Sequence, residues 1–238
     1  ANNTALKSLD LNSNTALATM VLTNNTLLNS LNVNNILVST LDVSTNTAIT
    51  DLWITDNSKL TSINVSGNAV LASLSVSGNL LLKTLDLSNN IQLTDLNLKN
   101  NAGLTNLDVS NTRITNFTIA KSTAITDLTI NNTVFTKLDL RENKALVHLT
   151  ANNTALTSLE FELNTVLSAI TLKNNKSMSS LEVENTLLST LDVSTNTAIT
   201  DLRITNNTNL TSINVSGSTT LSNLNVKANP LLTSLDLN

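Results

Sequence analysis

The sequence predicts an all-β protein: a parallel two-sheet solenoid of about eleven coils of 21–22 residues, each made of two half-units of 10–11 residues. Three observations predict this fold. Leucine-like anchor residues recur 22 times along the 238 residues, at spacings of 11 or 10. The residues three before and two after each anchor are apolar in every unit. The fourteen residues STLDVSTNTAITDL occur at 39–52 and again at 189–202, so part of the repeat array was copied within the chain.

Each anchor is the centre of a predicted short strand. Apolar and polar residues alternate around it, as in Thr-Leu-Asp-Val-Ser, which is typical of a strand with one buried face. A half-unit is too short to close a coil around a core, so two half-units form one coil with a strand on each long side. The anchors are Leu9, Met20, Leu31, Leu41, Leu52, Ile63, Leu74, Leu85, Leu96, Leu107, Phe117, Leu128, Leu138, Leu149, Leu159, Ile170, Leu181, Leu191, Leu202, Ile213, Leu224 and Leu235.

Asparagine lies six residues before the anchor in 20 of the 22 units. Its short amide can bond to the backbone of its own coil and of the neighbouring coil, which satisfies buried polar groups. We therefore predict an asparagine ladder with a structural role. In the five 10-residue units we expect the missing residue to lie between the strand and the asparagine; these asparagines are Asn35, Asn111, Asn132, Asn153 and Asn185.

The segment LKSLDLNSN at 6–14 resembles the leucine-rich repeat signature, and LSTLDVSTNTAITDLRITNN at 188–207 is similar to the repeats of bacterial surface proteins of the internalin J type. The resemblance covers the whole chain. It implies secretion or surface display and the binding of a host protein or glycan. The chain departs from that family in having Ile54 and Ile204 where the family carries a cysteine ladder, and it lacks the family's capping domain, wall anchor and adhesion modules.

Composition excludes several classes of function. The net charge of −4 and the pI near 4.9, without a basic patch, argue against nucleic acid as a partner. No apolar run approaches twenty residues, so we expect no membrane insertion, and the N-terminus has no signal-peptide pattern. Cysteine is absent, which excludes disulfides and thiolate metal sites. We expect no metal, no cofactor and no catalytic residue.

Side chains that flank an anchor should point outward, and alternate half-units should present two different faces. Four of the five glutamates fall on two successive coils of one face, where in-register strands would stack like charges roughly 4.8 Å apart. A salt-bridge ladder with Lys137, Arg141 and Arg203 is the favoured interpretation, and a site for a cation or basic ligand is the alternative. The glutamates are Glu160, Glu162, Glu182 and Glu184, and Asp139 precedes them in the same columns.

Stacked carboxylates about 5 Å apart would also match a retaining glycosidase. Any stacked carboxylates on this scaffold would have that separation, however, so the match carries little information, and we expect no enzyme. His148 is the only histidine and is expected to be an ordinary surface residue.

Trp53 is the second candidate site, because it takes an outward position whereas the three phenylalanines take inward ones. The equivalent residue 150 positions later is Arg203, so this outward position changed after the segment was copied. A surface tryptophan can anchor a sugar or a protein, and it can equally be an incidental exposed residue.

We predict one solenoid domain over residues 1–238 without terminal caps, whose end coils are covered by flanking domains or by end-to-end neighbours. The predicted function is a non-enzymatic binding or adhesion scaffold, extracellular or on a bacterial cell surface. The first alternative is a structural stalk spanning roughly 50 Å. Ice binding is less favoured, because the threonine columns lie beside the turns. The candidate ligand-binding residues are Asp51, Trp53, Lys137, Asp139, Arg141, Glu160, Glu162, Glu182, Glu184, Asp201 and Arg203.

Overall fold

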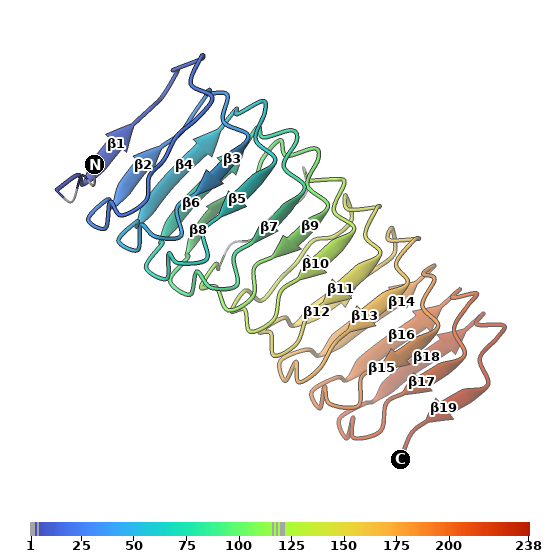
Figure 1. The fold of residues 1–238 in the computed structure, drawn as a ribbon. Helices are drawn as coiled ribbons and strands as arrows, with labels where there is room; N and C mark the ends of the chain where they lie inside the picture. The colour runs from blue at the N-terminus through green and yellow to red at the C-terminus, as the bar shows by residue number, and fades with distance from the viewer. Residues whose placement is uncertain (1–2, 4, 116, 118, 120–121) are drawn as a thin grey trace. The chain divides into compact units, whose positions relative to one another are not determined.

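The computed structural model describes residues 3, 5–115, 117, 119 and 122–238. The chain divides into two compact units, Ala1–Asn116 and Phe117–Asn238. Each unit is a parallel β-solenoid with repeats of about 22 residues, and the described residues contain no helix (Figure 1). The predicted fold class is confirmed, with about ten turns in place of eleven coils. The prediction of one domain over 1–238 stays a prediction.

The first unit has strands on two sides of each coil. One side is a five-stranded parallel sheet in which each strand pairs with the strand one coil later, so that Leu31 lies opposite Leu52 and Leu52 opposite Leu74. Its strands are β1 (Ser8–Asp10), β2 (Ser30–Asn32), β4 (Asp51–Thr55), β6 (Ser73–Ser77) and β8 (Asp95–Asn97). The other side pairs β3 (Thr40–Asp42) with β5 (Ser62–Asn64), and β7 (Thr84–Asp86) with β9 (Asn106–Asp108).

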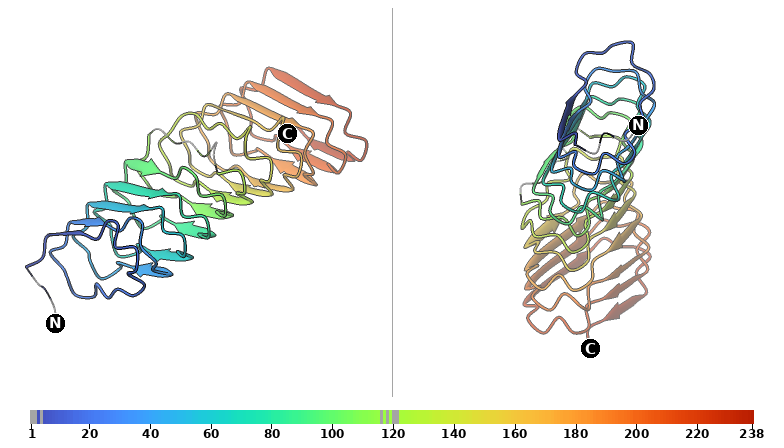
Figure 2. Two further views of the ribbon diagram at one scale, coloured as in Figure 1. Left: turned by 90° about the horizontal axis from the view of Figure 1, so that it is seen from above. Right: turned by 60° about the vertical axis from the view of Figure 1, so that its left-hand side comes forward.

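The second unit repeats this arrangement, and Figure 2 shows the successive turns of each unit stacked on one another. One side is the sheet of β12 (Ser158–Glu160), β14 (Ser180–Glu184), β16 (Asp201–Thr205) and β18 (Asn223–Lys227). The other side holds β10 (Asp127–Thr129), β11 (His148–Thr150) and β13 (Ala169–Thr171), followed by β15 (Thr190–Asp192), β17 (Ser212–Asn214) and β19 (Ser234–Asp236). The two predicted faces therefore correspond to the observed sheets.

The apolar positions form the interior of each unit. Leu52 and Ile54 are fully buried, as are Leu98 and Leu107 to within a few per cent, whereas Leu96 is half-buried. In the second unit the rings of Phe117 and Phe135 stack with centroids 5.3 Å apart. Burial of this stripe is the main stabilising term of the fold, since no coil can bury its apolar face alone.

Strands were predicted at every anchor, and two of those predictions are wrong. The residues around Met20 and around Leu138 have no strand, although the backbone still bonds to the next coil there, as in the bonds from Leu37 N–H to Leu17 C=O and from Thr157 N–H to Thr136 C=O. Most strands have only three residues, so a segment that lacks one inter-strand hydrogen-bond pair no longer forms a strand. The strand predicted at Phe117 involves positions 116 and 118, which lie outside the described residues.

The asparagine ladder is present, and it exists in two forms. In one form the amide donates to a carbonyl of the preceding coil and its oxygen accepts a backbone N–H from that coil: Asn57 Nδ2 donates to Val33 O (2.7 Å), and Asn57 Oδ1 accepts from Ile36 N (3.0 Å). In the other form both amide hydrogens go to carbonyls: Asn68 Nδ2 donates to Val43 O and Asn46 O. The Oδ1 atom of Asn68 is then buried without a partner.

The form depends on where the backbone N–H of the preceding coil points. In several turns that contain a residue with positive φ, the next N–H points along the stack to the ladder oxygen, although the turns at Asn24 and Asn111 have positive φ and still close on themselves. Asn35 (φ 52°) precedes Ile36 in this way, and Gly78 (φ 69°) precedes Asn79, whose N–H bonds to Asn101 Oδ1. Where the turn instead closes on itself, as in the bond from Asn46 N–H to Val43 C=O, no N–H is available for the next asparagine.

The position of the missing residue in the 10-residue units was predicted wrongly. Their asparagines are exposed and have positive φ, so they are turn residues and not members of the ladder. Asparagine tolerates this left-handed conformation better than most residues do. The ladder position is the following residue, and the deletion lies between it and the apolar residue before the strand. The residues that replace asparagine in the ladder are Ile36, Thr112, Thr133, Thr154 and Thr186.

Two outward columns are also structural. The Asp or Asn after an anchor accepts the backbone N–H two residues later, as Asp42 Oδ1 does from Ser44 N (2.9 Å), which fixes the turn that follows the strand. Threonines before the strands donate to a carbonyl of the preceding coil, as Thr61 Oγ1 does to Ser39 O (3.0 Å) and Thr105 Oγ1 to Lys83 O (3.1 Å). These hydroxyls hold adjacent coils together, which is a role that ice binding would not require.

The ladder predicts unequal effects for two neighbouring asparagines. Asn57→Ala should lower the free energy of unfolding by about 2–4 kcal/mol, because it leaves the buried Val33 carbonyl and Ile36 N–H without partners. Asn35→Gly should change it by no more than about 0.5 kcal/mol, because glycine adopts positive φ freely. Urea denaturation measures both. Equal losses in the two variants would contradict the assignment of Asn35 to the turn.

Candidate functional site

The candidate residues fall into two surfaces on different units. The charged surface consists of Lys137, Asp139, Arg141, Glu160, Glu182, Glu184 and Arg203 in the second unit. The tryptophan surface consists of the outward side chains of β1, β2, β4, β6 and β8 in the first unit, around Trp53. Each is described by itself.

In the charged surface the predicted stacking of glutamates is present. Glu160 lies opposite Glu182 in the pairing of β12 with β14, and Glu182 lies opposite Arg203 in the pairing of β14 with β16. Arg203 contacts both glutamates of β14: Nε is 3.2 Å from Glu182 Oε1, and an Nη atom is 3.5 Å from Glu184 Oε2. Asn206 Nδ2 donates to the other oxygen of Glu184 (3.2 Å). The carboxylates of β14 therefore have cationic or amide partners within the protein.

The pKa of Glu182 is raised above its ordinary value of 4.5. Partial burial is the main cause, since it disfavours the charged form. Arg203 opposes this effect, while Glu184 and Glu160 add to it. The neighbouring carboxylates thus contribute less to the raised pKa of Glu182 than burial does, and Arg203 opposes both effects.

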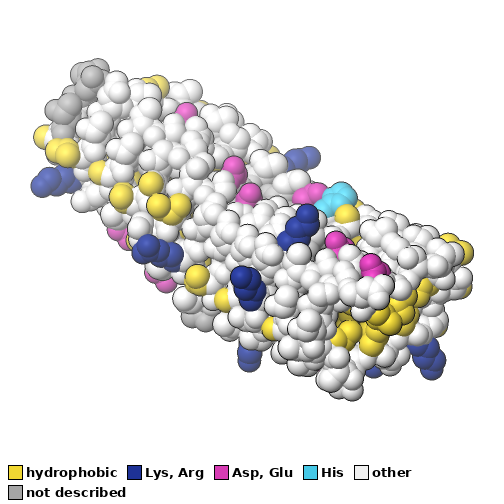
Figure 3. Space-filling model, turned by 90° about the horizontal axis from the view of Figure 1, so that it is seen from below, with side chains coloured by type: hydrophobic (Ala, Val, Ile, Leu, Met, Phe, Trp, Pro, Cys, Tyr) yellow, Lys and Arg dark blue, Asp and Glu magenta, His cyan; other side chains and the backbone are white. Residues whose placement is uncertain are grey.

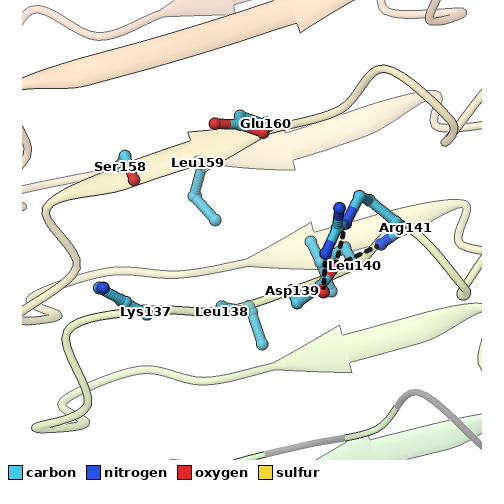
Figure 4. Close-up of a pocket in the computed structure, with 8 residues that line it drawn as sticks. All are labelled: Lys137, Leu138, Asp139, Leu140, Arg141, Ser158, Leu159 and Glu160. Atoms are coloured by element: carbon cyan, nitrogen blue, oxygen red, sulfur yellow. Dashed lines mark hydrogen bonds and ion pairs between the residues drawn. The ribbon is translucent and has the colours of Figure 1, made fainter.

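Asp139 and Arg141 form a second ion pair at the edge of a shallow groove. The carboxylate accepts two bonds from the guanidinium, at 2.9 Å and 2.6 Å, and a third from the backbone N–H of Arg141. These bonds lower the pKa of Asp139 to about 2, chiefly through the Arg141 side chain. Figure 4 shows the pair turned toward each other, with Lys137 at the other end of the groove and Glu160 on the next coil.

Three candidates are less closely involved in this surface. Glu162 lies two residues past the end of β12 and is exposed, so it is not in the paired part of the sheet opposite Glu184. Asp201 is exposed on β16, opposite Ser180 and Asn223. Asp51 belongs to the other surface, where its Oδ2 accepts the Thr50 hydroxyl (2.7 Å).

Trp53 is 38% exposed and lies between two shallow grooves. Its register partners are Asn32 on β2 and Ser75 on β6. One groove is lined by Ser8, Asp10, Ser30, Asn32 and Asn34; the other is lined by Ser73, Ser75, Thr94, Asp95 and Asn97.

The sequence analysis missed Asn32 and Asn34. The copied frame could have revealed them, because the inward residues that alternate with them are retained 150 positions later: Leu31, Val33, Leu52 and Ile54 recur as Leu181, Val183, Leu202 and Ile204. Other buried positions differ, as Ile36 and Val38 do from Thr186 and Leu188. On the outside, several positions change; on the next strand, for example, Ser75 and Ser77 correspond to Asn225 and Lys227. Asn32, Asn34 and Trp53 correspond to Glu182, Glu184 and Arg203. At these three positions one copy therefore carries an aromatic ring and two amides, and the other carries three charged side chains.

His148 has a partner that was not predicted. Its Nδ1 lies 2.6 Å from Asp127 Oδ1 on the adjacent strand, and both side chains are about half exposed. The histidine is the cyan side chain in Figure 3, on a surface that is otherwise mostly uncharged. The contact joins two neighbouring strands and agrees with a surface role.

Within the described ranges, no group of three or more His, Asp or Glu side chains is arranged to hold a metal ion. None of the described segments is a helix with the length and apolar character needed to cross a membrane.

The geometry predicts how Asp139 titrates. Arg141→Ala should raise the pKa of Asp139 from about 2 toward 3.8, because the two guanidinium bonds are lost, as a carboxyl NMR titration would show. A lowered folded-state pKa contributes stability above the unfolded value, and this contribution is lost as the pH falls through about 2. At pH 7 the melting temperature should change little, because the pair is exposed. An unchanged pKa would mean that the turn N–H alone lowers it.

No protein-family model matches the chain, and no curated protein matches it. Among solved structures, it is similar to the functional domain of InlJ from Listeria monocytogenes, which includes a cysteine ladder: 26% identity, a TM-score of 0.39, and coverage of 88% of this chain and 54% of that one. It is also similar to the internalin InlF from Listeria monocytogenes str. 4b F2365 (16% identity, TM-score 0.32, coverage 99% and 88%). A third similar structure is the APL1 leucine-rich repeat domain, with 15% identity, a TM-score of 0.32, and coverage of 98% of this chain and 74% of that one. This chain spans about half the length of the InlJ domain and contains no cysteine.

Proposed function

We propose that this chain is a non-enzymatic binding scaffold that recognises a protein or glycan through the outward side chains of its sheets. The location that accompanies this proposal is extracellular or at a bacterial cell surface, as the repeat signature implies. The candidate residues are those of the tryptophan surface and of the charged surface.

The observation that carries the proposal is the coordinated change between the two copies. The four inward residues around the site are identical, whereas the three outward residues change from Asn32, Asn34 and Trp53 to Glu182, Glu184 and Arg203. A stiff spacer needs the interior and the ladder but has no requirement for a particular outward surface. Exposed residues that vary as a group on a retained frame are what a binding protein requires.

The charged surface supports a binding role less strongly than the tryptophan surface does. The carboxylates of Glu182 and Glu184 already have partners within the protein. Exposed ion pairs of this kind each contribute little to the free energy of unfolding. The ion pair with Arg203 argues against a catalytic role of Glu182, because a general acid or a nucleophile needs a side chain free to meet a substrate. Trp53 has a large exposed aromatic surface.

An array of glycans and purified extracellular proteins tests this proposal. The chain should bind at least one component, and Trp53→Ala or the double variant Glu160→Gln/Glu182→Gln should reduce that binding at least tenfold. The melting temperature should stay nearly unchanged, because the substituted side chains are outside the core. Binding to no component would favour the stalk, and binding that all outward variants retain would contradict the assignment of the sheets as the binding faces.

A further inference from the structure

The tryptophan surface has a chemistry that the charged surface lacks. The outward residues of its five strands are Ser, Thr, Asn, Asp and Trp, with no lysine or arginine. Trp53 is the one aromatic side chain among them, and a groove adjoins it on either side along the stack. A ligand of this surface must therefore tolerate acidic neighbours and contact a single aromatic plane.

The polar groups around Trp53 suit hydroxyl partners. Serine hydroxyls and asparagine amides both donate and accept, and the bond from Asn97 Nδ2 to Ser75 Oγ (3.1 Å) holds two of them in place across adjacent strands. The Oδ1 atom of Asn32 is covered and has no hydrogen-bond donor in the described part of the chain. Because protein atoms cover this oxygen, the Asn32 amide must turn outward before a ligand hydroxyl can bond to it and satisfy the unpaired acceptor.

The acidic groups limit the charge of the ligand. One oxygen of Asp51 accepts the Thr50 hydroxyl (2.7 Å), and one oxygen of Asp95 accepts the Thr94 hydroxyl (3.0 Å). The other oxygen of each carboxylate can accept from a neighbouring hydroxyl group. With three carboxylates (Asp10, Asp51 and Asp95) and no cation on the strands, a phosphate, sulfate or uronate polymer would be repelled.

A protein partner fits this surface poorly. The cores of protein interfaces are enriched in aromatic residues, methionine and arginine and depleted in serine and aspartate. Here a single aromatic residue is surrounded by serines and asparagines. Carbohydrate recognition needs less apolar area, because one aromatic face stacks on the C–H face of a sugar ring while amides and carboxylates bind its hydroxyls.

We propose that the tryptophan surface binds a neutral, linear polysaccharide that lies along the stacking direction over Trp53. This inference rests on the proposed binding function and specifies its ligand. The two grooves extend the site from β1 to β8, so it covers four inter-strand spacings of about 4.8 Å, or roughly 19 Å. That length accommodates several sugar residues, and the affinity should therefore rise with chain length.

Trp53 is the only tryptophan, so its fluorescence emission reports on this site directly. The probes are neutral oligosaccharides of two to six residues from cellulose, chitin, xylan and mannan, with heparin as an anionic comparison. At least one neutral series should change the emission saturably, and the hexasaccharide should bind at least tenfold more tightly than the disaccharide. Heparin should produce no saturable change.

The copied frame provides a matched variant. Asn32→Glu/Asn34→Glu/Trp53→Arg installs the side chains that the second copy carries at the equivalent positions. Because Asn34 Oδ1 accepts the Thr55 N–H (2.8 Å), the melting temperature of this variant is measured beside that of the wild type to show that the fold is kept. By calorimetry the triple variant should lose at least tenfold in affinity for the hexasaccharide. His148→Ala, a control outside both candidate surfaces on β11, should leave that affinity unchanged.

The outcomes separate the two proposals. If no neutral oligosaccharide binds but the array yields a protein whose binding depends on Trp53, the ligand class is wrong and the binding function stands. If neither binds, both proposals fail. Tighter binding of heparin than of every neutral series, or an unchanged affinity in the triple variant, would overturn the assignment of a neutral glycan to this surface.

Discussion

In each coil the backbone forms a turn that borders the apolar interior, and the buried N–H and C=O groups of that turn need hydrogen-bond partners. The ladder supplies them. An amide fits because it can donate to a carbonyl and accept an N–H one coil away, as Asn57 does from its fully buried position. Threonine takes over where the turn is one residue shorter: Thr154 N–H and hydroxyl both bond to Asn175 Oδ1. This requirement restricts the interior to a few side chains and leaves the outside free to vary.

Much of the polar surface serves the same purpose. The Asp after an anchor fixes a turn, and the Thr before a strand ties its coil to the previous one. Outward polar columns in such a repeat are therefore poor evidence of a binding site. The positions that remain are those whose side chains do not stabilise a turn, and Trp53 is the largest of these.

The two copies show how one frame carries two surfaces of different chemistry. In the second unit, Arg203 neutralises part of the repulsion between glutamates, and the groups largely satisfy one another. In the first unit, Trp53 and its amide neighbours are uncharged, and one amide oxygen has no donor. The charged surface is thus largely paired within the protein, whereas Trp53 leaves part of an aromatic face exposed. Because the four interior residues next to these positions recur in both copies, this difference resides mainly in the outward side chains.

The sequence by itself determined the repeat, the strands and the two faces, because alternation in a strand has a period of two and in-register pairing brings equivalent positions together. It thereby placed Glu160 beside Glu182 and put Trp53 on the outside. Only the tertiary structure decided which asparagines belong to the ladder, since the same residue suits both a buried amide and a turn with positive φ, and the backbone angle chooses between them. It also decided which glutamates Arg203 contacts and where the grooves beside Trp53 lie, because these depend on side-chain positions across coils that no local pattern encodes.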